Sequence, residues 1–420
     1  MTPHTTPPFQ KLGSYWDDQT LPNRHRQGKL WHVLFLAATA FGIFMLAILL
    51  ADQINNSFGY AAFEAKVPPA AFTPNGENLE ALDEAQLIAI INEKLTPNRV
   101  KTLEKAQPLE ERAKEDLIDI VNAEIVKPTL KASWGLFASL FQKEAILAET
   151  AEKYPDAYIQ FVSWLNADFV RTPQNSDPLY AGISTAIVGS LYVIVITILV
   201  AFPIGVSAAI YLQEYAEDSW FNRLIQTNIN NLAGVPSVIY GMLGLAIFVR
   251  ALSALTSGAL TGYADADPDN GRTILSAGLT MALLILPVII INAQEAIKAV
   301  PNSLREASFG LGATQWQTVW AHVLPNAIPG ILTGTIISIS RAFGETAPLI
   351  IVGASTYITF NPDGVFSRFT TLPIQIYQWT SRPQEAFHHI ASAGILTLLA
   401  LLLAINAFAI FLRNRYSRKL

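Results

Sequence analysis

Six apolar runs of membrane-spanning length restrict this chain to an all-α integral membrane fold. An α-helix rises about 1.5 Å per residue, so about 20 apolar residues cross a hydrocarbon core of about 30 Å. The runs are Leu30–Ala51, Pro178–Leu212, Leu224–Val249, Thr273–Gln294, Asn326–Phe360 and Ile390–Leu412. The run that begins at Asn326 contains Arg341 and Glu345, whereas the others contain no Asp, Glu, Lys or Arg. Each run predicts one transmembrane helix.

The first run is too long for the apolar core of a cleaved signal peptide, which spans about 7–15 residues. We therefore expect residues 30–51 to be the first transmembrane helix, after a polar cytoplasmic tail over 1–29. A soluble insert over 52–178 follows, and a core over 179–412 contains the remaining five predicted helices.

The insert has the composition of a small soluble domain. The stretch Asp52–Asp177 holds 32 of the 61 charged residues of the chain. Its length is sufficient to bury a core of its own. Periodic apolar residues predict a mainly helical fold, with helices near Leu79–Leu95 and Lys131–Lys153 and an apolar face of Leu117, Ile120, Val121 and Ile125. The sequence of the insert shows no metal-ligand spacing, nucleophile–base pair or phosphate-binding loop, and the chain has no cysteine.

Lysine and arginine residues at the two ends of the chain predict cytoplasmic termini. Residues 1–29 carry four of these residues, and the basic tail over 413–420 carries four more. Positive residues are retained on the cytoplasmic side, and an even number of crossings returns the chain to the side on which it starts. The insert and the acidic loop with Asp265, Asp267 and Asp269 then face the periplasm, and the loop near 294–325 faces the cytoplasm.

This cytoplasmic loop has a spaced motif. Glu306-Ala307-Ser308 is followed by Gly312, six residues after the glutamate, and then by Leu324-Pro325. Ser303 with Glu306, and Thr314 with Gln317, have the spacing of capping boxes. We therefore expect two short helices joined at Gly312, the second of them ended by Pro325.

The motif resembles the EAA loop of ABC importer permeases, with Ser308 in place of the third small residue. In that family the loop docks in a groove of the ATP-hydrolysing subunit. The resemblance implies that Glu306, Ala307, Gly312, Leu324 and Pro325 couple this chain to an ATPase, with an apolar docking face of Leu304, Ala307, Leu311, Trp316 and Trp320. Without the resemblance, an ordinary structured loop is the simpler interpretation.

The charged pair in the fifth predicted helix suggests a binding role. If the helix runs over about Asn326–Val352, Arg341 lies near its midpoint and shares a face with Ser338 and Glu345. A lone charge at the bilayer centre costs about 2.5–3.5 kcal/mol, so such residues usually have a function. A guanidinium matches phosphate oxygens in a bidentate way. We therefore expect Arg341, Glu345 and Ser338 to line the substrate pathway, with Glu345 competing for the arginine; a purely structural ion pair is the alternative.

The motif Arg341-Ala342-Phe343-Gly344-Glu345-Thr346-Ala347-Pro348 is similar to that of phosphate-importer permeases of the PstA type, and so is Asn231–Gly241. This resemblance implies a type I ABC importer permease fold, like that of methionine importers. It also implies as partners a paralogous PstC-type permease, a dimeric PstB-type ATPase and a periplasmic phosphate-binding protein. The chain has no G-x-x-x-x-G-K-[ST] motif, so no cofactor is expected on it, and the partner ATPase is expected to bind ATP-Mg.

The sequence thus predicts a non-enzymatic permease subunit that imports inorganic phosphate across the bacterial inner membrane, in contact with membrane lipid. The net charge of −5 gives no reason to expect nucleic acid. Three alternatives remain. An importer of another oxyanion or small solute would keep the EAA loop; an ion-coupled transporter or channel would show acidic relays in several helices; a membrane-anchored interaction protein would function through its insert.

Overall fold

The computed structural model of the protein describes residues 21–65, 72, 82–262, 271–354 and 357–417. The first 20 residues of the predicted tail over 1–29, the acidic loop with Asp265, Asp267 and Asp269, and the last residues of the basic tail, 418–420, lie outside the described residues. The contacts divide the chain into two compact units between Ile54 and Asn55. The insert and the helical core both belong to the second unit, Asn55–Leu420.

The first unit contains most of helix α1, Leu21–Ser57. The helix includes the predicted span 30–51, and its most apolar window has no buried residue in the structure. Leu34, Phe41 and Phe44 are examples of its exposed apolar side chains. A helix that exposes apolar residues on all sides is stable in lipid and not in water.

The insert contains a three-stranded antiparallel sheet that the sequence analysis did not predict. Strands β1 (Phe58–Glu64), β2 (Thr129–Ser133) and β3 (Ala157–Ser163) are arranged in the order β2-β1-β3. The expected helix over Lys131–Lys153 is therefore wrong at its start, which lies in β2. Its remainder forms two helices, α5 and α6. The strands are short, and each pairs with a partner distant in sequence, such as Ala61 with Ser133.

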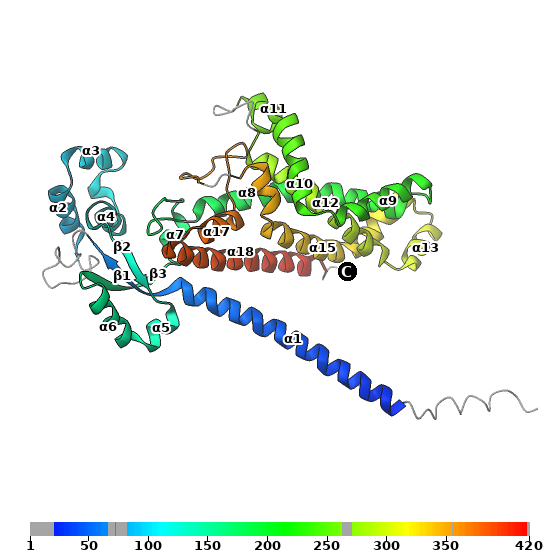
Figure 1. Ribbon diagram of the computed structural model, residues 1–420. Coiled ribbons are helices and arrows are strands. Elements are labelled where there is room, and N and C mark those ends of the chain that lie inside the picture. The colour runs from blue at the N-terminus through cyan, green and yellow to red at the C-terminus, as the bar shows by residue number, and fades with distance from the viewer. Residues whose placement is uncertain (1–20, 66–71, 73–81, 263–270, 355–356, 418–420) are drawn as a thin grey trace, which may run out of the picture. The chain divides into compact units, whose positions relative to one another are not determined.

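The helices of the insert agree better with the sequence. They are α2 (Glu84–Lys94), α3 (Pro97–Ala106), α4 (Lys114–Val121), α5 (Leu136–Phe141), α6 (Lys143–Lys153) and α7 (Ala167–Arg171). The predicted apolar face of α4 is confirmed, because Leu117 and Val121 are fully buried in a core with Leu87 and Ile91. In Figure 1, the strands separate α2, α3 and α4 from α5 and α6.

Four long helices form the frame of the core: α8 (Ser184–Ile210), α12 (Ile274–Lys298), α15 (Leu324–Gly344) and α18 (Glu385–Ser417). Small residues permit close packing, since a Cβ on Gly278 of α12 would lie 2.5 Å from Ile196 of α8. Among the described residues, these four helices and α1 are long and apolar enough to cross a membrane, which makes five candidate spans, or six if one bent pair is a single span. The predicted multi-pass, mostly helical fold is confirmed.

The bent pair occupies the third predicted crossing, which is therefore not one straight helix. Helix α9 (Trp220–Ala233) meets α10 (Ser237–Gly244) at 105°, and α10 continues as the π-helical segment η8 (Leu245–Ala251). Gly234 caps α9, and Pro236 has no backbone N–H to extend it. The Tyr240 hydroxyl donates a hydrogen bond of 2.8 Å to the Leu232 carbonyl, which fixes the corner.

The fifth predicted helix is also interrupted. Helix α15 ends at Gly344, Glu345 is extended, and the short helix α16 covers Ala347–Val352. The expected continuous helix Asn326–Val352 is therefore wrong. Pro348 explains the interruption, because its ring cannot donate the hydrogen bond that would join the two helices.

Two short helices mark opposite ends of the core. Helix α13 (Asn302–Gly310) lies at one end and α17 (Leu372–Thr380) at the other (Figure 1). Contacts among the helix ends show that α8 and α12 run toward the α13 end, whereas α15 starts there. The core helices thus alternate in direction, as consecutive membrane crossings require.

Candidate functional site

The loop with the EAA-like motif forms a compact turn between α13 and α14 (Gln315–Thr318). Gly312 has φ +85°, the left-handed conformation expected for a residue that ends a helix. Its N–H donates to the Phe309 carbonyl at 2.9 Å, and the Ala313 N–H donates to the Ser308 carbonyl at 3.2 Å. These two bonds are those of a Schellman motif, so the predicted helix end at Gly312 is confirmed.

One of the two predicted capping boxes is formed. The Thr314 hydroxyl accepts from the Gln317 N–H at 3.3 Å, and the Gln317 side chain accepts from the Thr314 N–H at 2.9 Å. The box of Ser303 and Glu306 is wrong, because α13 begins at Asn302 after Pro301, so Ser303 lies inside the helix and not at its N-cap. The carboxylate of Glu306 is consequently not used as a cap, and Glu306 and Ala307 are both exposed.

Pro325 does not end the second helix, contrary to the prediction. The helical segment continues from Gln315 through the π-helical turn η10 (Val319–Val323) into α15, a stretch of 30 residues. Pro325 lies at the start of α15, directly after the π-helical turn. The Asn326 side chain donates to the His322 carbonyl at 2.7 Å. The loop and α15 are therefore mechanically continuous.

The outer face of the loop is apolar and exposed. Leu311 is 91% exposed, and the rings of Trp316 and Trp320 stack 5.6 Å apart with more than half of each residue exposed. Phe309 and Leu304 add to this surface. On the inner side, Ser308 makes a buried hydroxyl–hydroxyl hydrogen bond of 2.8 Å to Thr318. This bond gives a reason for a serine at the third motif position: it ties α13 to α14.

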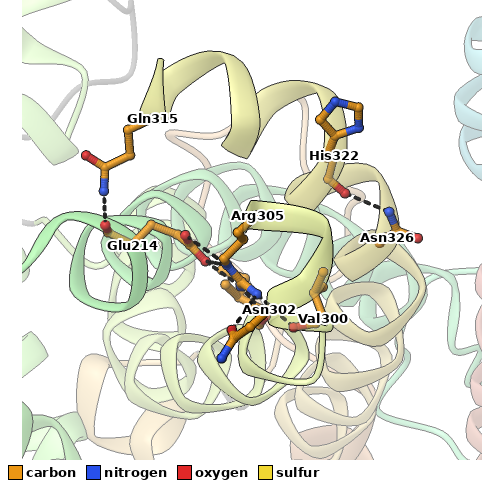
Figure 2. Close-up of polar contacts among 8 residues, drawn as sticks. Glu214, Val300, Asn302, Arg305, Gln315, His322 and Asn326 are labelled. Atoms are coloured by element: carbon orange, nitrogen blue, oxygen red, sulfur yellow. Dashed lines mark hydrogen bonds and ion pairs between the residues drawn. The ribbon is translucent and has the colours of Figure 1, made fainter. Parts of the chain in front are cut away.

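Arg305, which the sequence analysis did not single out, holds the loop to the core (Figure 2). Its guanidinium forms an ion pair with Glu214 of η7 (Tyr211–Tyr215), the π-helical end of α8, with Nη2 2.7 Å from Oε1. It also donates to the Val300 carbonyl at 2.7 Å and the Ile297 carbonyl at 3.0 Å, at the end of α12. The side chain of Gln315 donates to the Glu214 carbonyl.

The arginine thus joins the ends of α8 and α12 to the first turn of α13. The two side chains are only 15% and 8% exposed, so the pair is largely shielded from water. A signal was available in the sequence: Glu214 lies two residues after the apolar run that forms α8, on the side of the membrane where the predicted topology puts Arg305. Opposite charges at the same depth are candidates for pairing.

Arg341 lies in the last turn of α15 and not near the middle of a helix. A cation is favourable there because the last turn carries unpaired carbonyl groups. Glu345 is its ion partner among the described residues, with Nε 3.6 Å from Oε1. This separation exceeds hydrogen-bond length, and the Arg341 side chain is 54% exposed. Its donors are therefore available to a further anion.

Ser338 lies near Arg341 but is engaged within its own helix. A cavity of about 10 Å³, room for about one water molecule, has both residues in its wall, together with Tyr240 and Ser237 of α10 and Leu284 of α12. Ser338 is 1% exposed, and its hydroxyl donates to the Gly334 carbonyl at 2.9 Å. It can only offer a lone pair to the cavity, so the guanidinium of Arg341 is the charged donor in this wall. The assignment of this trio to a substrate pathway stays a prediction.

Comparisons with known proteins agree with the resemblance seen in the motifs. The sequence profile of the family "Binding-protein-dependent transport system inner membrane component" matches residues 201–420. The probable ABC transporter permease protein YqgI of Bacillus subtilis (strain 168) is 30% identical over 314 residues, covering 71% of this chain and 99% of that protein. The phosphate transport system permease protein PstA of Mycobacterium leprae (strain TN) is 34% identical over 239 residues, covering 57% of this chain and 72% of that protein.

Solved importers are also similar. The methionine ABC transporter MetNI in an inward-facing conformation aligns with a TM-score of 0.42 and 19% identity, covering 58% of this chain and 99% of that chain. The family match over residues 201–420 includes the loop with the EAA-like motif, α15 and Arg341. Permeases of this kind are multi-pass inner-membrane proteins without catalytic activity, and they act with ATPase subunits and periplasmic binding proteins. The chain therefore belongs to the binding-protein-dependent transport system inner membrane components, the permease subunits of ABC importers.

Proposed function

We propose that this chain is a permease subunit of an ATP-driven importer of inorganic phosphate. Its partners are a paralogous PstC-type permease, a dimeric PstB-type ATPase and a periplasmic phosphate-binding protein. The observation that carries the proposal is the half-exposed Arg341 guanidinium beside a cavity, loosely paired with Glu345. Relatives named PstA support phosphate as the substrate, whereas the name of YqgI gives no substrate.

Arg341 is the transient anion contact in this proposal. Its fork of N–H donors fits two oxygens of a phosphate, which a lysine could not match in geometry. Glu345 competes with phosphate for the same guanidinium. Its carboxylate lies 3.6 Å from Arg341 Nε, which is close enough for electrostatic attraction but too far for a hydrogen bond. The carboxylate therefore favours release of phosphate after each passage.

Coupling to the ATPase uses the exposed apolar face of Leu304, Leu311, Trp316 and Trp320. Such a face fits a hydrophobic groove on the ATPase, with Glu306 and Ala307 exposed on the same loop. Displacement of the loop reaches α15 directly, since the segment from Gln315 to Gly344 is continuous. The distance from Gln315 to Arg341 along it is about 40 Å. The Arg305 contacts transmit the same displacement to α8 and α12.

The proposed orientation has both termini in the cytoplasm and the insert over 52–178 in the periplasm. The positive residues near the termini support it. A further support is that α8 and α12 end at the loop and α15 starts there. This is the arrangement expected if the second and fourth crossings run toward the cytoplasm and the fifth runs away from it.

The test is phosphate uptake by cells with Arg341→Gln or Glu345→Gln at matched membrane levels. We expect Arg341→Gln to lose most uptake, and Glu345→Gln to bind phosphate while importing it more slowly. Arg250→Gln is the matched control, because Arg250 is likewise exposed in the last turn of a helical segment, η8. Near-normal uptake by Arg341→Gln would contradict the pathway role.

The second candidate function is import of another oxyanion. Uptake of labelled phosphate, sulfate and molybdate is compared in a strain that lacks this chain. Loss of phosphate uptake alone supports the proposal. Loss of sulfate or molybdate uptake with normal phosphate uptake would reassign the substrate while leaving the coupling loop in its role.

A further inference from the structure

Helix α5, Leu136–Phe141, buries its serine and exposes its large apolar side chains, which is the reverse of a helix on the surface of a soluble domain. Its serine, Ser139, is 3% exposed, whereas Phe137, Leu140 and Phe141 are 51%, 64% and 81% exposed. A helix on a water-facing surface buries its apolar side chains and exposes its polar ones. A cluster of three large apolar side chains on six residues indicates a surface that something apolar covers.

The buried side of α5 is firmly attached, so its exposed face is not the result of a loose segment. The Ser139 hydroxyl accepts from the Tyr60 N–H of β1 at 2.8 Å and donates to the Gly135 carbonyl at 2.9 Å. The Phe137 N–H donates to the Asn55 side chain at 2.9 Å. A Cβ on Gly135 would lie 2.4 Å from the Asn55 amide nitrogen, so the two segments are in close contact.

The contact with Asn55 sets the depth of α5 relative to the membrane. The apolar run of α1 ends at Ala51, and the helix continues without a break to Ser57. Asn55 therefore lies about 6 Å beyond the end of the run along the helix axis. The headgroup region on each side of the hydrocarbon is about 5–8 Å thick. The first turn of α5 is thus held at headgroup level.

We propose that α5 inserts Phe137, Leu140 and Phe141 into the membrane–water interface and anchors the insert on the lipid surface. The occupant is lipid because Asn55, which holds the first turn of α5, lies four residues after the end of the predicted membrane-spanning run of α1. Interfacial helices bury apolar side chains about 5–10 Å into the boundary of headgroups and acyl chains. Lys143 is exposed two residues after α5, where its ammonium group can contact lipid phosphates.

The absence of cysteine from the sequence allows a direct measurement. Phe141→Cys and, separately, Leu140→Cys are labelled with a nitroxide in the full chain, purified with its partner subunits and placed in lipid nanodiscs. Collision with oxygen, which is enriched in lipid, is compared with collision with a water-soluble nickel chelate. Lys153→Cys on exposed α6 is the water control, and Phe44→Cys on α1 is the lipid control.

We expect both labels on α5 to show an oxygen-to-nickel collision ratio several-fold above that of Lys153→Cys and nearer to that of Phe44→Cys. A ratio equal to that of Lys153→Cys would overturn the proposal, because the cluster would then face water. Protection from both reagents would overturn it as well, since a protein subunit would then cover the cluster. Both positions are exposed in the structure, so the substitutions remove little packing.

Discussion

At the scale of single residues, the ion pair of Arg305 and Glu214 shows that residues outside the motif hold the loop to the helical core. The motif residues Glu306 and Ala307 are exposed and make the outer surface, whereas the residue before them joins three helix ends. The guanidinium donates hydrogen bonds to backbone carbonyls at the end of α12 and, at the same time, to the carboxylate at the end of α8. Arg305 therefore positions the loop that we propose to couple the chain to an ATPase.

Arg305→Ala is expected to uncouple the transporter without removing it from the membrane. Truncation of one partner of a largely buried ion pair costs about 3–5 kcal/mol, here concentrated at the junction of α8, α12 and α13. Substrate-stimulated ATP hydrolysis and uptake are measured on the assembled complex. The control is Arg223→Ala, which removes an ion pair with Asp218 whose side chains are 67% and 83% exposed and is worth about 0–1 kcal/mol. Equal effects of the two variants would show that Arg305 has no special role.

Gly312 provides a second prediction at this scale. Its φ of +85° penalises any residue with a Cβ, although no atom within 4 Å would obstruct one. Gly312→Val is therefore expected to weaken binding of the ATPase subunit in co-purification, since a branched residue in this conformation costs about 1–2 kcal/mol. Gly312→Asn should be milder, because asparagine tolerates the left-handed region. Gly310→Val is the control, with open space and ordinary backbone; if it weakens binding as much, backbone conformation is not the cause.

The surroundings of a side chain could be predicted from the sequence only where the helix boundaries next to it were predicted correctly. The turn at Gly312 and the box of Thr314 and Gln317 follow from local spacing, and both are present. The depth of Arg341 depended on a helix that continued past Pro348, and the helix ends before it. Arg305 was missed because its partner is 91 residues away in sequence.

At the scale of elements, four of the six long apolar runs became continuous helices, whereas two are interrupted and the short strands of the insert were not predicted. The runs that became α1, α8, α12 and α18 are long and apolar enough to cross a membrane. The three strands of the insert are only five to seven residues long and depend on pairing across distant segments. The 105° corner between α9 and α10 depends on a tertiary hydrogen bond from Tyr240, which no local pattern reveals.

Close packing of α10 gives a prediction at this scale. A Cβ on Gly244 would lie 2.2 Å from the Thr280 hydroxyl of α12, and one on Gly241 would lie 2.6 Å from the Pro348 Cα of α16. Gly244→Leu should therefore lower the melting temperature of the purified protein, since overpacking costs about 1–3 kcal/mol. Gly42→Leu on α1 meets no atom within 4 Å and should leave that temperature unchanged. A similar melting temperature for both variants would mean that α10 is free to move away from α12.

At the scale of the whole molecule, the insert and the core meet at His389 of α18, within the unit Asn55–Leu420. His389 Nδ1 lies 2.7 Å from the Asn56 carbonyl, and Nε2 lies 2.6 Å from the Ser133 hydroxyl of β2. A carbonyl can only accept, so Nδ1 carries the proton and Nε2 accepts from the serine. The ring also stacks on Trp164 at 5.2 Å. These partners come from three segments far away along the chain, so no local spacing around His389 indicates them.

This joint predicts that the insert loosens when His389 loses its polar contacts. His389→Phe keeps a ring to stack on Trp164 but leaves the Ser133 hydroxyl and the Asn56 carbonyl without their partner, at a cost of about 1–3 kcal/mol for each unsatisfied group. Proteolysis within the insert should accelerate in the membrane-embedded complex, because cleavage follows the population of locally opened states. His388→Phe is the matched control, since His388 is the exposed neighbour on the same helix. If both variants are cleaved at the native rate, the insert is held by its other contacts with the core, such as the Gln174 side chain that accepts from the Ile358 N–H.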